Sequence, residues 1–254
     1  MSLFVIVPGF GAPHTQKKLE ILQSNLAIIR SHPWTSLEVV VCAYDSESTY
    51  EPIGSTHDSE SFPGVRWVEE KGVVGDFIRR HASAITTDYV MILLDDVELQ
   101  PDVNFTQLLE FQRQFQFDIV SPTLTRKSKY QFEYMRTNPF EPYDIKVVAC
   151  CECFCLFFPA AAYQKYYALL SPENPWLWGL DMMLWKVFGF NIGMLNRMTM
   201  HHHYKGESYA PHLPNPAEGY QYEIKKYGVN NDDLVNHPAE HYWITRNPLH
   251  SVIP

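Results

Sequence analysis

Residues 89–102 read YVMILLDDVELQPD. An apolar run that begins at Tyr89 stops abruptly at two adjacent aspartates, Asp95 and Asp96. A continuous apolar run of this kind is typical of a parallel strand that is covered on both faces. Carboxylates at the end of such a strand either mark its exit into solvent or hold a ligand, and the flanking sequence has to distinguish the two.

The sequence on both sides of this stretch alternates between strand and helix patterns. Apolar runs bounded by turn residues predict strands, and apolar residues at helical spacing predict helices. The predicted strands are 2–10, 37–46, 65–72, 89–99 and 117–124, and the predicted helices are 17–32, 72–86 and 105–115. This alternation predicts an α/β open sheet, mostly parallel and flanked by helices.

In an open α/β sheet, ligands bind at the carboxyl ends of the strands. Turn-forming or polar residues end three of the predicted strands, namely Pro8 and Gly9, Tyr44 and Asp45, and Asp95 and Asp96. We therefore expect these three strand ends to converge on one ligand-binding edge.

The second half of the chain has a different pattern. We expect a long strand at 147–159, a helix at 160–170, a helix that begins near Asp181 and a short helix at 217–228. The segment after about Gly206 has little apolar periodicity, so we expect it to wrap the domain.

The composition restricts the function classes. The 254-residue chain carries a net charge of −9, which argues against a general nucleic-acid-binding surface. We expect neither a signal peptide nor a membrane span, because no stretch approaches the roughly 18 apolar residues that a span needs. Five cysteines, four of them within 150–155, predict free buried thiols in a reducing compartment, which we take to be the cytoplasm.

Two acidic segments have the residue types of a catalytic site. Asp95 and Asp96 can ligate Mg²⁺ or Mn²⁺, and such an ion neutralises a diphosphate; otherwise they form an acidic turn that caps the next segment. WLWGLD (176–181) combines aromatic faces suited to sugar rings with Asp181, which can take a proton from a hydroxyl. The structural alternative is that the tryptophans pack in the core and that Asp181 begins a helix.

Two further segments carry nitrogen ligands and cations. One imidazole of the run 201–203 can be another metal ligand, but three consecutive side chains cannot all face one ion. In KGVVGDFIRR (71–80), two glycines permit a tight turn into a helix whose Arg79 and Arg80 can reach a base or a phosphate. Exposed arginines are also common on helices without any such role.

Taken in order, these segments resemble the GT-A class of nucleotide-sugar glycosyltransferases. Residues 72–102 resemble the glycine turn, basic helix, apolar strand and D-x-D-type metal motif of that class, with Leu94 in place of the first aspartate. Residues 154–167 and 176–185 resemble its acceptor half. The stretch from WGLD to the histidines is similar to a plant family of glycosyltransferase-like proteins. The opening is similar to a glycosyltransferase domain of chlorella-infecting large DNA viruses.

The resemblance implies a GT-A type sheet in a single domain, residues 1–206. Its Rossmann-like half, residues 1–100, would bind the nucleotide sugar, and residues 101–206 would form the acceptor half. Residues 207–254 would be a tail that wraps the domain. If the chain is viral, the expected compartment is the cytoplasm of the host cell.

The resemblance also implies a role for each candidate site residue. Asp96 would ligate Mn²⁺ or Mg²⁺ together with His202 or one of its neighbours, and Asp95 would contact the ribose. The remaining nucleotide contacts would be Pro8, Gly9, Tyr44, Asp45, Lys71 and Arg79, or Arg80 in place of Arg79. Asp181 would be the base of an inverting enzyme or would orient the acceptor in a retaining one. Trp176 and Trp178 would form the acceptor platform.

The sequence therefore predicts a metal-dependent glycosyltransferase of the hexosyltransferase type, which moves a sugar from a UDP-sugar to a glycan or another hydroxyl acceptor. One alternative is a metal-dependent hydrolase or nucleotidyltransferase, which would use water or a second nucleotide. Another is an inactive GT-A fold that binds a nucleotide sugar or a glycan, because Leu94 replaces an expected aspartate. The sugar, the acceptor, the stereochemistry and the oligomeric state stay open.

Overall fold

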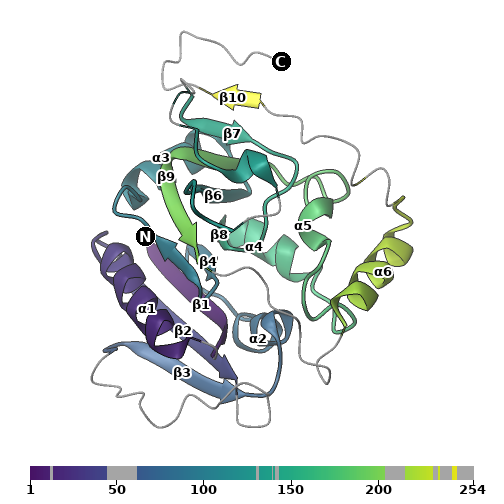
Figure 1. Cartoon of the computed structure of the whole chain (residues 1–254), viewed down its shortest axis with the longest axis horizontal. Helices are drawn as coiled ribbons and strands as arrows, with labels where there is room; N and C mark the ends of the chain where they lie inside the picture. Colours follow the sequence, from purple (N-terminus) through teal and green to yellow (C-terminus); the bar gives the residue numbers. More distant parts are fainter. Residues whose placement is uncertain are drawn as a thin grey trace.

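The structure is a computed structural model. It describes residues 1–11, 14–44, 62–129, 132–138, 140, 143–203, 215–230, 234 and 242–244. One sheet runs through the molecule, and helices pack along it (Figure 1).

The strands are β1 (Ser2–Phe10), β2 (Ser36–Tyr44), β3 (Val65–Glu70), β4 (Tyr89–Leu93), β5 (Val97–Leu99), β6 (Ile119–Leu124), β7 (Ile145–Val147), β8 (Cys155–Pro159), β9 (Ile192–His202) and β10 (Tyr242–Ile244). The helices are α1 (Thr15–Arg30), α2 (Val74–His81), α3 (Phe105–Phe115), α4 (Ala160–Tyr167), α5 (Leu180–Met183) and α6 (Pro216–Tyr227), with a 3₁₀ turn, η1 (Glu133–Met135). The predicted helices at 17–32, 72–86, 105–115, 160–170 and 217–228 are thus confirmed within a few residues at their ends.

The strand order is β10-β7-β9-β6-β8-β4-β1-β2-β3, and β5 pairs with β9 beside this path. The strands β3, β2, β1 and β4 are parallel, and β6 is parallel to β9. β8 runs antiparallel to β4 and β6, and β7 runs antiparallel to β9 and β10. Among the described residues, seven of the nine strands on this path therefore point the same way. The predicted open, mostly parallel α/β sheet is confirmed.

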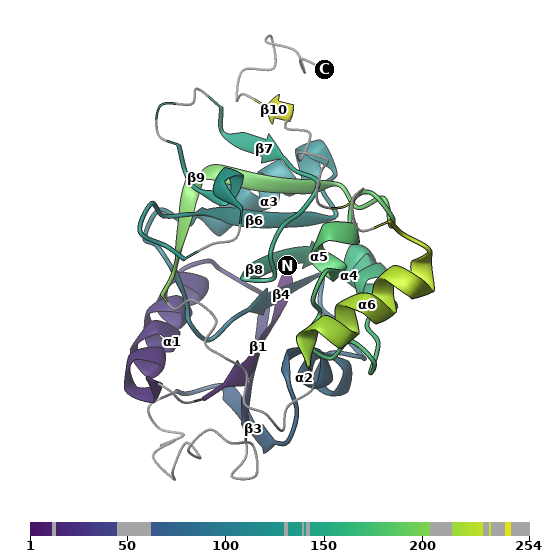
Figure 2. The ribbon, with the colours of Figure 1, turned by 45° about the vertical axis from the view of Figure 1, so that its right-hand side comes forward.

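The middle of the sheet is buried because helices cover it on both sides. β4 is buried along its whole length, and the strand β1 beside it is buried from Leu3 onward. Figure 2 shows α1 on one side of this part of the sheet and α2 and α4 on the other. Two covered faces explain why the strands are continuous apolar runs and do not alternate with polar residues.

Two predicted strands are wrong in extent. The segment 89–99 is two strands, because a turn at Asp95 and Asp96 ends β4, and β5 then leaves β4 to pair with β9. The segment 147–159 is also two strands: β7 ends at Val147, β8 begins at Cys155, and the two lie at different places in the sheet. The intervening loop has the apolar composition of a strand because much of it is buried.

The expected turn at Pro8 and Gly9 is a bulge inside β1. Pro8 is opposite Cys42 and Phe10 is opposite Ala43, so Gly9 is the extra residue of this bulge. Its φ of 79° lies in the left-handed region that glycine adopts without strain. Proline is tolerated here because a bulge relaxes the ladder of backbone hydrogen bonds.

The last described helix, α6, lies on the α5 side of the molecule (Figures 1 and 2). Within the described part of the chain, every helix is too short or too polar to cross a membrane.

Candidate functional site

The turn between β4 and β5 carries the acidic motif, and a buried asparagine holds its second strand. Asn25 of α1 donates from its side-chain nitrogen to the Val97 carbonyl at 2.7 Å, and its side-chain oxygen accepts from the Leu99 amide at 2.7 Å. These are the bonds that a neighbouring strand would otherwise supply. On its other edge, β5 pairs with β9, so that Val97 lies opposite His202. The turn at Asp95 and Asp96 is therefore held between α1 and β9, the strand that carries His202.

Asp96 and His202 face each other across this pairing. The distance between Asp96 Oδ2 and His202 Nε2 is 3.1 Å. The other ring nitrogen, Nδ1, lies 2.8 Å from the Lys129 carbonyl, and since a carbonyl only accepts, Nδ1 carries the proton. The Phe154 ring stacks on the imidazole with 4.2 Å between centroids. Burial lowers the pKa of His202, but the Asp96 carboxylate, the Lys129 carbonyl and the Glu152 charge together outweigh burial and leave that pKa raised.

This pair has the donor chemistry of a divalent-cation site. Because Nδ1 carries a proton, the 3.1 Å contact between Nε2 and the Asp96 carboxylate is that of a protonated imidazole that donates from Nε2. A divalent cation would take the place of this second proton, between the imidazole nitrogen and the carboxylate oxygen. Over the residues that the structure describes, no group of three or more histidine, cysteine, aspartate or glutamate side chains is arranged to hold an ion. Two protein ligands suffice for Mg²⁺, which takes its remaining ligands from water and substrate phosphates.

The other two histidines point elsewhere. His203 Nε2 lies 2.8 Å from Glu98 Oε2, and His201 Nδ1 lies 2.7 Å from the Thr125 hydroxyl. Of the three candidates, the structure therefore places His202 beside Asp96. The Glu98 side chain contacts His203. In the β5–β9 ladder, Glu98 lies opposite His201, one position along from the Val97–His202 pair.

Asp95 is tied to the first strand and helix. Lys18 Nζ lies 2.7 Å from Asp95 Oδ2, and the same oxygen accepts from the Gly11 amide at 3.2 Å. Burial raises the pKa of the Asp95 carboxyl to about 6, although Lys18 opposes this shift. Asp95 thus connects the acidic turn to the carboxyl end of β1.

Tyr44 closes the same edge from β2. Its side chain is so close to β1 that a Cβ atom at Gly9 would lie 2.7 Å from the Tyr44 hydroxyl oxygen. The ring also packs edge-on against Phe77 of α2, with 5.6 Å between centroids. The ends of β1, β2 and β4 therefore meet as the sequence predicts. Asp45 lies outside the described residues.

The predicted basic contacts on α2 have protein partners. Arg79 Nη2 donates to Asp76 Oδ1 at 2.6 Å, and the Arg79 carbonyl accepts from the Tyr167 hydroxyl. Arg80 donates to the Lys71 carbonyl at 2.8 Å, while the Lys71 side chain is exposed. These contacts hold α2 against its neighbours.

Asp181 is the second residue of α5, which begins at Leu180. Gly179, just before the helix, has a left-handed backbone conformation. The Cys150 thiol donates to Asp181 Oδ2 at 3.8 Å between sulfur and oxygen. Burial raises the pKa of the Asp181 carboxyl to about 7, and the Glu152 carboxylate contributes to this shift. A carboxylate with such a pKa can hold or release a proton near neutral pH.

The loop between β7 and β8, residues 148–154, joins the two acidic regions. Cys150 contacts Asp181, and four residues later Phe154 stacks on His202. Glu152 lies between these two contacts, and its charge acts on the pKa of both groups. Glu152 is not among the residues predicted from the sequence; its available signal is a single acid within an otherwise apolar run.

The two tryptophans near Asp181 differ in exposure. Trp178 is 46% exposed, whereas Trp176 is half-buried. Leu177 between them is buried and has a φ of 63°, in the left-handed region. Gly75 of α2 packs on this segment and donates its amide proton to the Pro175 carbonyl at 2.7 Å.

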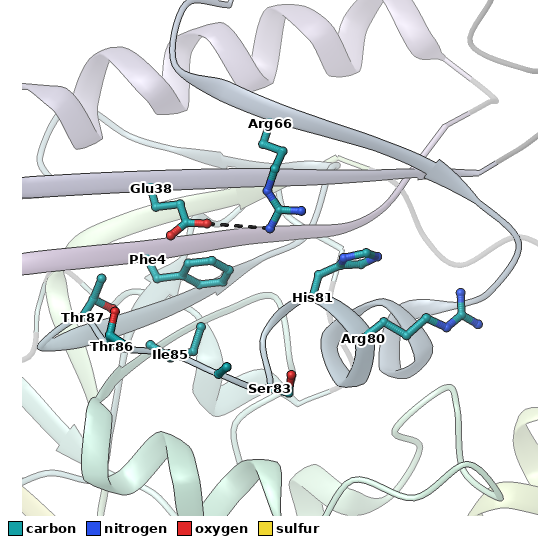
Figure 3. Close-up of a pocket in the computed structure, with 10 residues that line it drawn as sticks. Phe4, Glu38, Arg66, Arg80, His81, Ser83, Ile85, Thr86 and Thr87 are labelled. Atoms are coloured by element: carbon teal, nitrogen blue, oxygen red, sulfur yellow. Dashed lines mark ion pairs between the residues drawn. The ribbon is translucent and has the colours of Figure 1, made fainter.

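A separate pocket lies beside the carboxyl end of α2 (Figure 3). Arg66, Arg80 and His81 line it together with Glu38 and the segment 83–87. Arg66 of β3 pairs with Glu38 of the neighbouring strand β2 at 3.7 Å (Figure 3). Asp96, Asp181 and His202 do not line it, so this pocket is distinct from the edge described above.

Comparison with known proteins finds this fold among solved structures. No family model matches the sequence, and no curated protein matches it significantly. Among solved structures, S. aureus TarS 1-349 in complex with UDP-GlcNAc is similar to 92% of this chain, with 11% identity and a TM-score of 0.56. GalNAc-T7 with UDP, GalNAc and Mn²⁺ is likewise similar to 92% of the chain, with 11% identity and a TM-score of 0.61. The chain spans 69% of the first and 49% of the second. It has the GT-A fold of these proteins.

Proposed function

We propose that this chain is a metal-dependent glycosyltransferase, which moves a sugar from a UDP-sugar to a hydroxyl group of a glycan or another acceptor. The observation that carries the proposal is the Asp96–His202 pair at the end of β4, with the imidazole Nδ1 held by the Lys129 carbonyl. The fold supports the donor class, because TarS was solved with UDP-GlcNAc and GalNAc-T7 with UDP, GalNAc and Mn²⁺.

Asp96 and His202 would hold Mn²⁺ or Mg²⁺. When bound, such an ion stabilises the negative charge of a departing diphosphate. Asp96 supplies a hard oxygen ligand and His202 a nitrogen ligand, while Phe154 and Lys129 keep the imidazole in place. Leu94 in place of the first aspartate of the motif is compatible with this role, because His202 provides the second protein ligand.

The nucleoside would lie along the carboxyl ends of β1 and β2. Pro8, Gly9, Tyr44 and Asp45 would surround it, and Lys71 and Arg79 would lie at its α2 side. Asp95 would contact the ribose with its second oxygen, because its Oδ2 is already bound by Lys18 and by the Gly11 amide.

Asp181 would act on the acceptor. In an inverting reaction, the acceptor oxygen bonds to the anomeric carbon, the bond from that carbon to the diphosphate breaks, and the acceptor proton passes to Asp181. A carboxyl pKa of about 7 suits this step, because the base is then available near neutral pH and still binds the proton well. Trp176 and Trp178 would contact the acceptor.

The test begins with ligand binding. We expect a UDP-sugar panel to raise the Tm of the chain in the presence of Mn²⁺, and Asp96→Asn to remove this metal-linked rise. Glu110→Gln, which removes an exposed charge on α3, is the matched control and should retain the metal-linked rise in Tm. Absence of metal-linked stabilisation by every UDP-sugar in the wild-type chain would refute the proposal.

The second measurement is transfer. Asp181→Asn should keep UDP-sugar binding but lower transfer at least about a hundredfold, since a general base contributes that much or more. Full transfer by Asp181→Asn would refute the base assignment. Metal-linked binding without transfer or donor hydrolysis would identify an inactive binding protein, and release of the sugar to water alone would identify a hydrolase.

A further inference from the structure

Helix α6 is seated tightly on the acceptor-side loop. A Cβ atom at Gly219 would lie 2.4 Å from Asn174 Oδ1, so the helix backbone is in direct contact with this side chain. One turn later Glu223 is buried, and one turn after that the Tyr227 ring packs edge-on against Phe188 with 4.8 Å between centroids. Positions 219, 223 and 227 share one helix face, so this face is the docking surface of α6.

The same docking places Tyr220 beside the proposed base. A Cβ atom at Gly179 would lie 2.0 Å from Tyr220 Cδ2, which means that the ring lies directly against the backbone of Gly179. Asp181 follows two residues later. The pKa of the Tyr220 hydroxyl is raised by burial and then by the charge of Asp181, in agreement with their proximity. Tyr220 itself is half-buried, so part of its side chain faces solvent.

We infer that α6 forms one wall of the acceptor site and that the Tyr220 ring contacts a carbohydrate acceptor. The ring lies against Gly179, which directly follows the exposed Trp178 in the chain and precedes Asp181 by two positions. Aromatic faces near such groups can stack on the apolar face of a sugar ring. This inference rests on the proposed function, because it assigns the acceptor class of that site. Tyr220 is a specificity-determining residue in this arrangement, whereas the proton passes to Asp181.

The test measures binding of a panel of p-nitrophenyl glycosides to the full chain in the presence of UDP and Mn²⁺. We expect Tyr220→Ala to raise the Kd for the glycosides about tenfold, while Tyr220→Phe stays within about threefold of wild type because the ring is retained. Tyr222→Ala is the matched control, since Tyr222 lies on the same helix and packs with Lys226. The Kd for UDP, measured in parallel, should not change in any of these variants.

A second variant tests the position of α6 without removing the Tyr220 ring. Gly219→Val should displace α6 from Asn174 and weaken glycoside binding, while leaving UDP binding unchanged. Unchanged glycoside binding in Tyr220→Ala would overturn the inference, as would an equal loss of UDP binding in that variant. If wild type binds UDP with Mn²⁺ but none of the glycosides, the acceptor wall is refuted and the proposed donor site stands. If wild type binds glycosides but not UDP, the proposed function fails instead.

Discussion

Replacing Asn25 with leucine tests how the acidic turn is held in place. Asn25 is 2% exposed and makes two hydrogen bonds of 2.7 Å, one to the Val97 carbonyl and one from the Leu99 amide. Leucine is similar in size but can make neither bond. Each buried backbone group that loses its partner costs ~1–3 kcal/mol, so we expect the free energy of unfolding to fall by ~2–6 kcal/mol. That is a large part of the ~5–15 kcal/mol typical of a whole domain.

The assay is urea denaturation followed by tryptophan fluorescence. Gln23→Leu is the matched control, because Gln23 is exposed on the same helix, and its effect should stay within about 0.5 kcal/mol. Because β5 pairs with β9 at His202, Asn25→Leu should also weaken Mn²⁺-linked UDP binding. A loss below about 1 kcal/mol with an unchanged m-value would show that Asn25 does not hold β5.

Three further predictions concern the acceptor side. Transfer should fall as the pH drops below about 7, because Asp181 must be ionised to accept a proton; between pH 8 and pH 6 we expect a decrease of about tenfold, and a flat profile would exclude Asp181 as the base. Glu152→Gln should move this acid limb to lower pH, since the Glu152 charge raises the pKa of Asp181, and an upward shift would contradict that coupling. Gly179→Ala should lower the Tm, because alanine at a φ of 75° costs ~1–2 kcal/mol and its Cβ would collide with Tyr220. Tyr220→Ala in the same chain should restore part of this loss, and purely additive effects would argue against the contact.

The sheet could be predicted because its signals are local. The alternation of strand and helix patterns in the first half, and the strand end at Asp95 and Asp96, depend on residues that are close in the sequence. The convergence of the ends of β1, β2 and β4 then follows from the parallel arrangement of these strands.

The extent of β5 and β8 could not be predicted, because each depends on a partner far away in the chain. β5 separates from β4 because β9, about a hundred residues later, pairs with Val97–Leu99. The loop 148–154 has a strand-like composition, and only its position between two different places in the sheet makes it a loop.

The site residues also divide into those that local sequence predicts and those that depend on contacts distant in the chain. Sequence reasoning could nominate Asp96, Asp181 and the histidine run from their chemistry, but only the β5–β9 pairing distinguishes His202 from its neighbours. Glu152 and Tyr220 were missed because a single acid in an apolar run is a weak signal and Tyr220 has no sequence signal of its own. Their significance depends on contacts made by Cys150, Phe154 and Gly179 in three dimensions.

The loop 148–154 also restricts the distance between the two acidic regions. Its residue Cys150 contacts the proposed base and its residue Phe154 contacts the proposed metal ligand. Four residue steps of fully extended chain span at most ~14 Å, so the backbone at these two contacts cannot separate further than that. As long as both contacts are kept, this loop limits how far the proposed base and the proposed metal ligand can move apart.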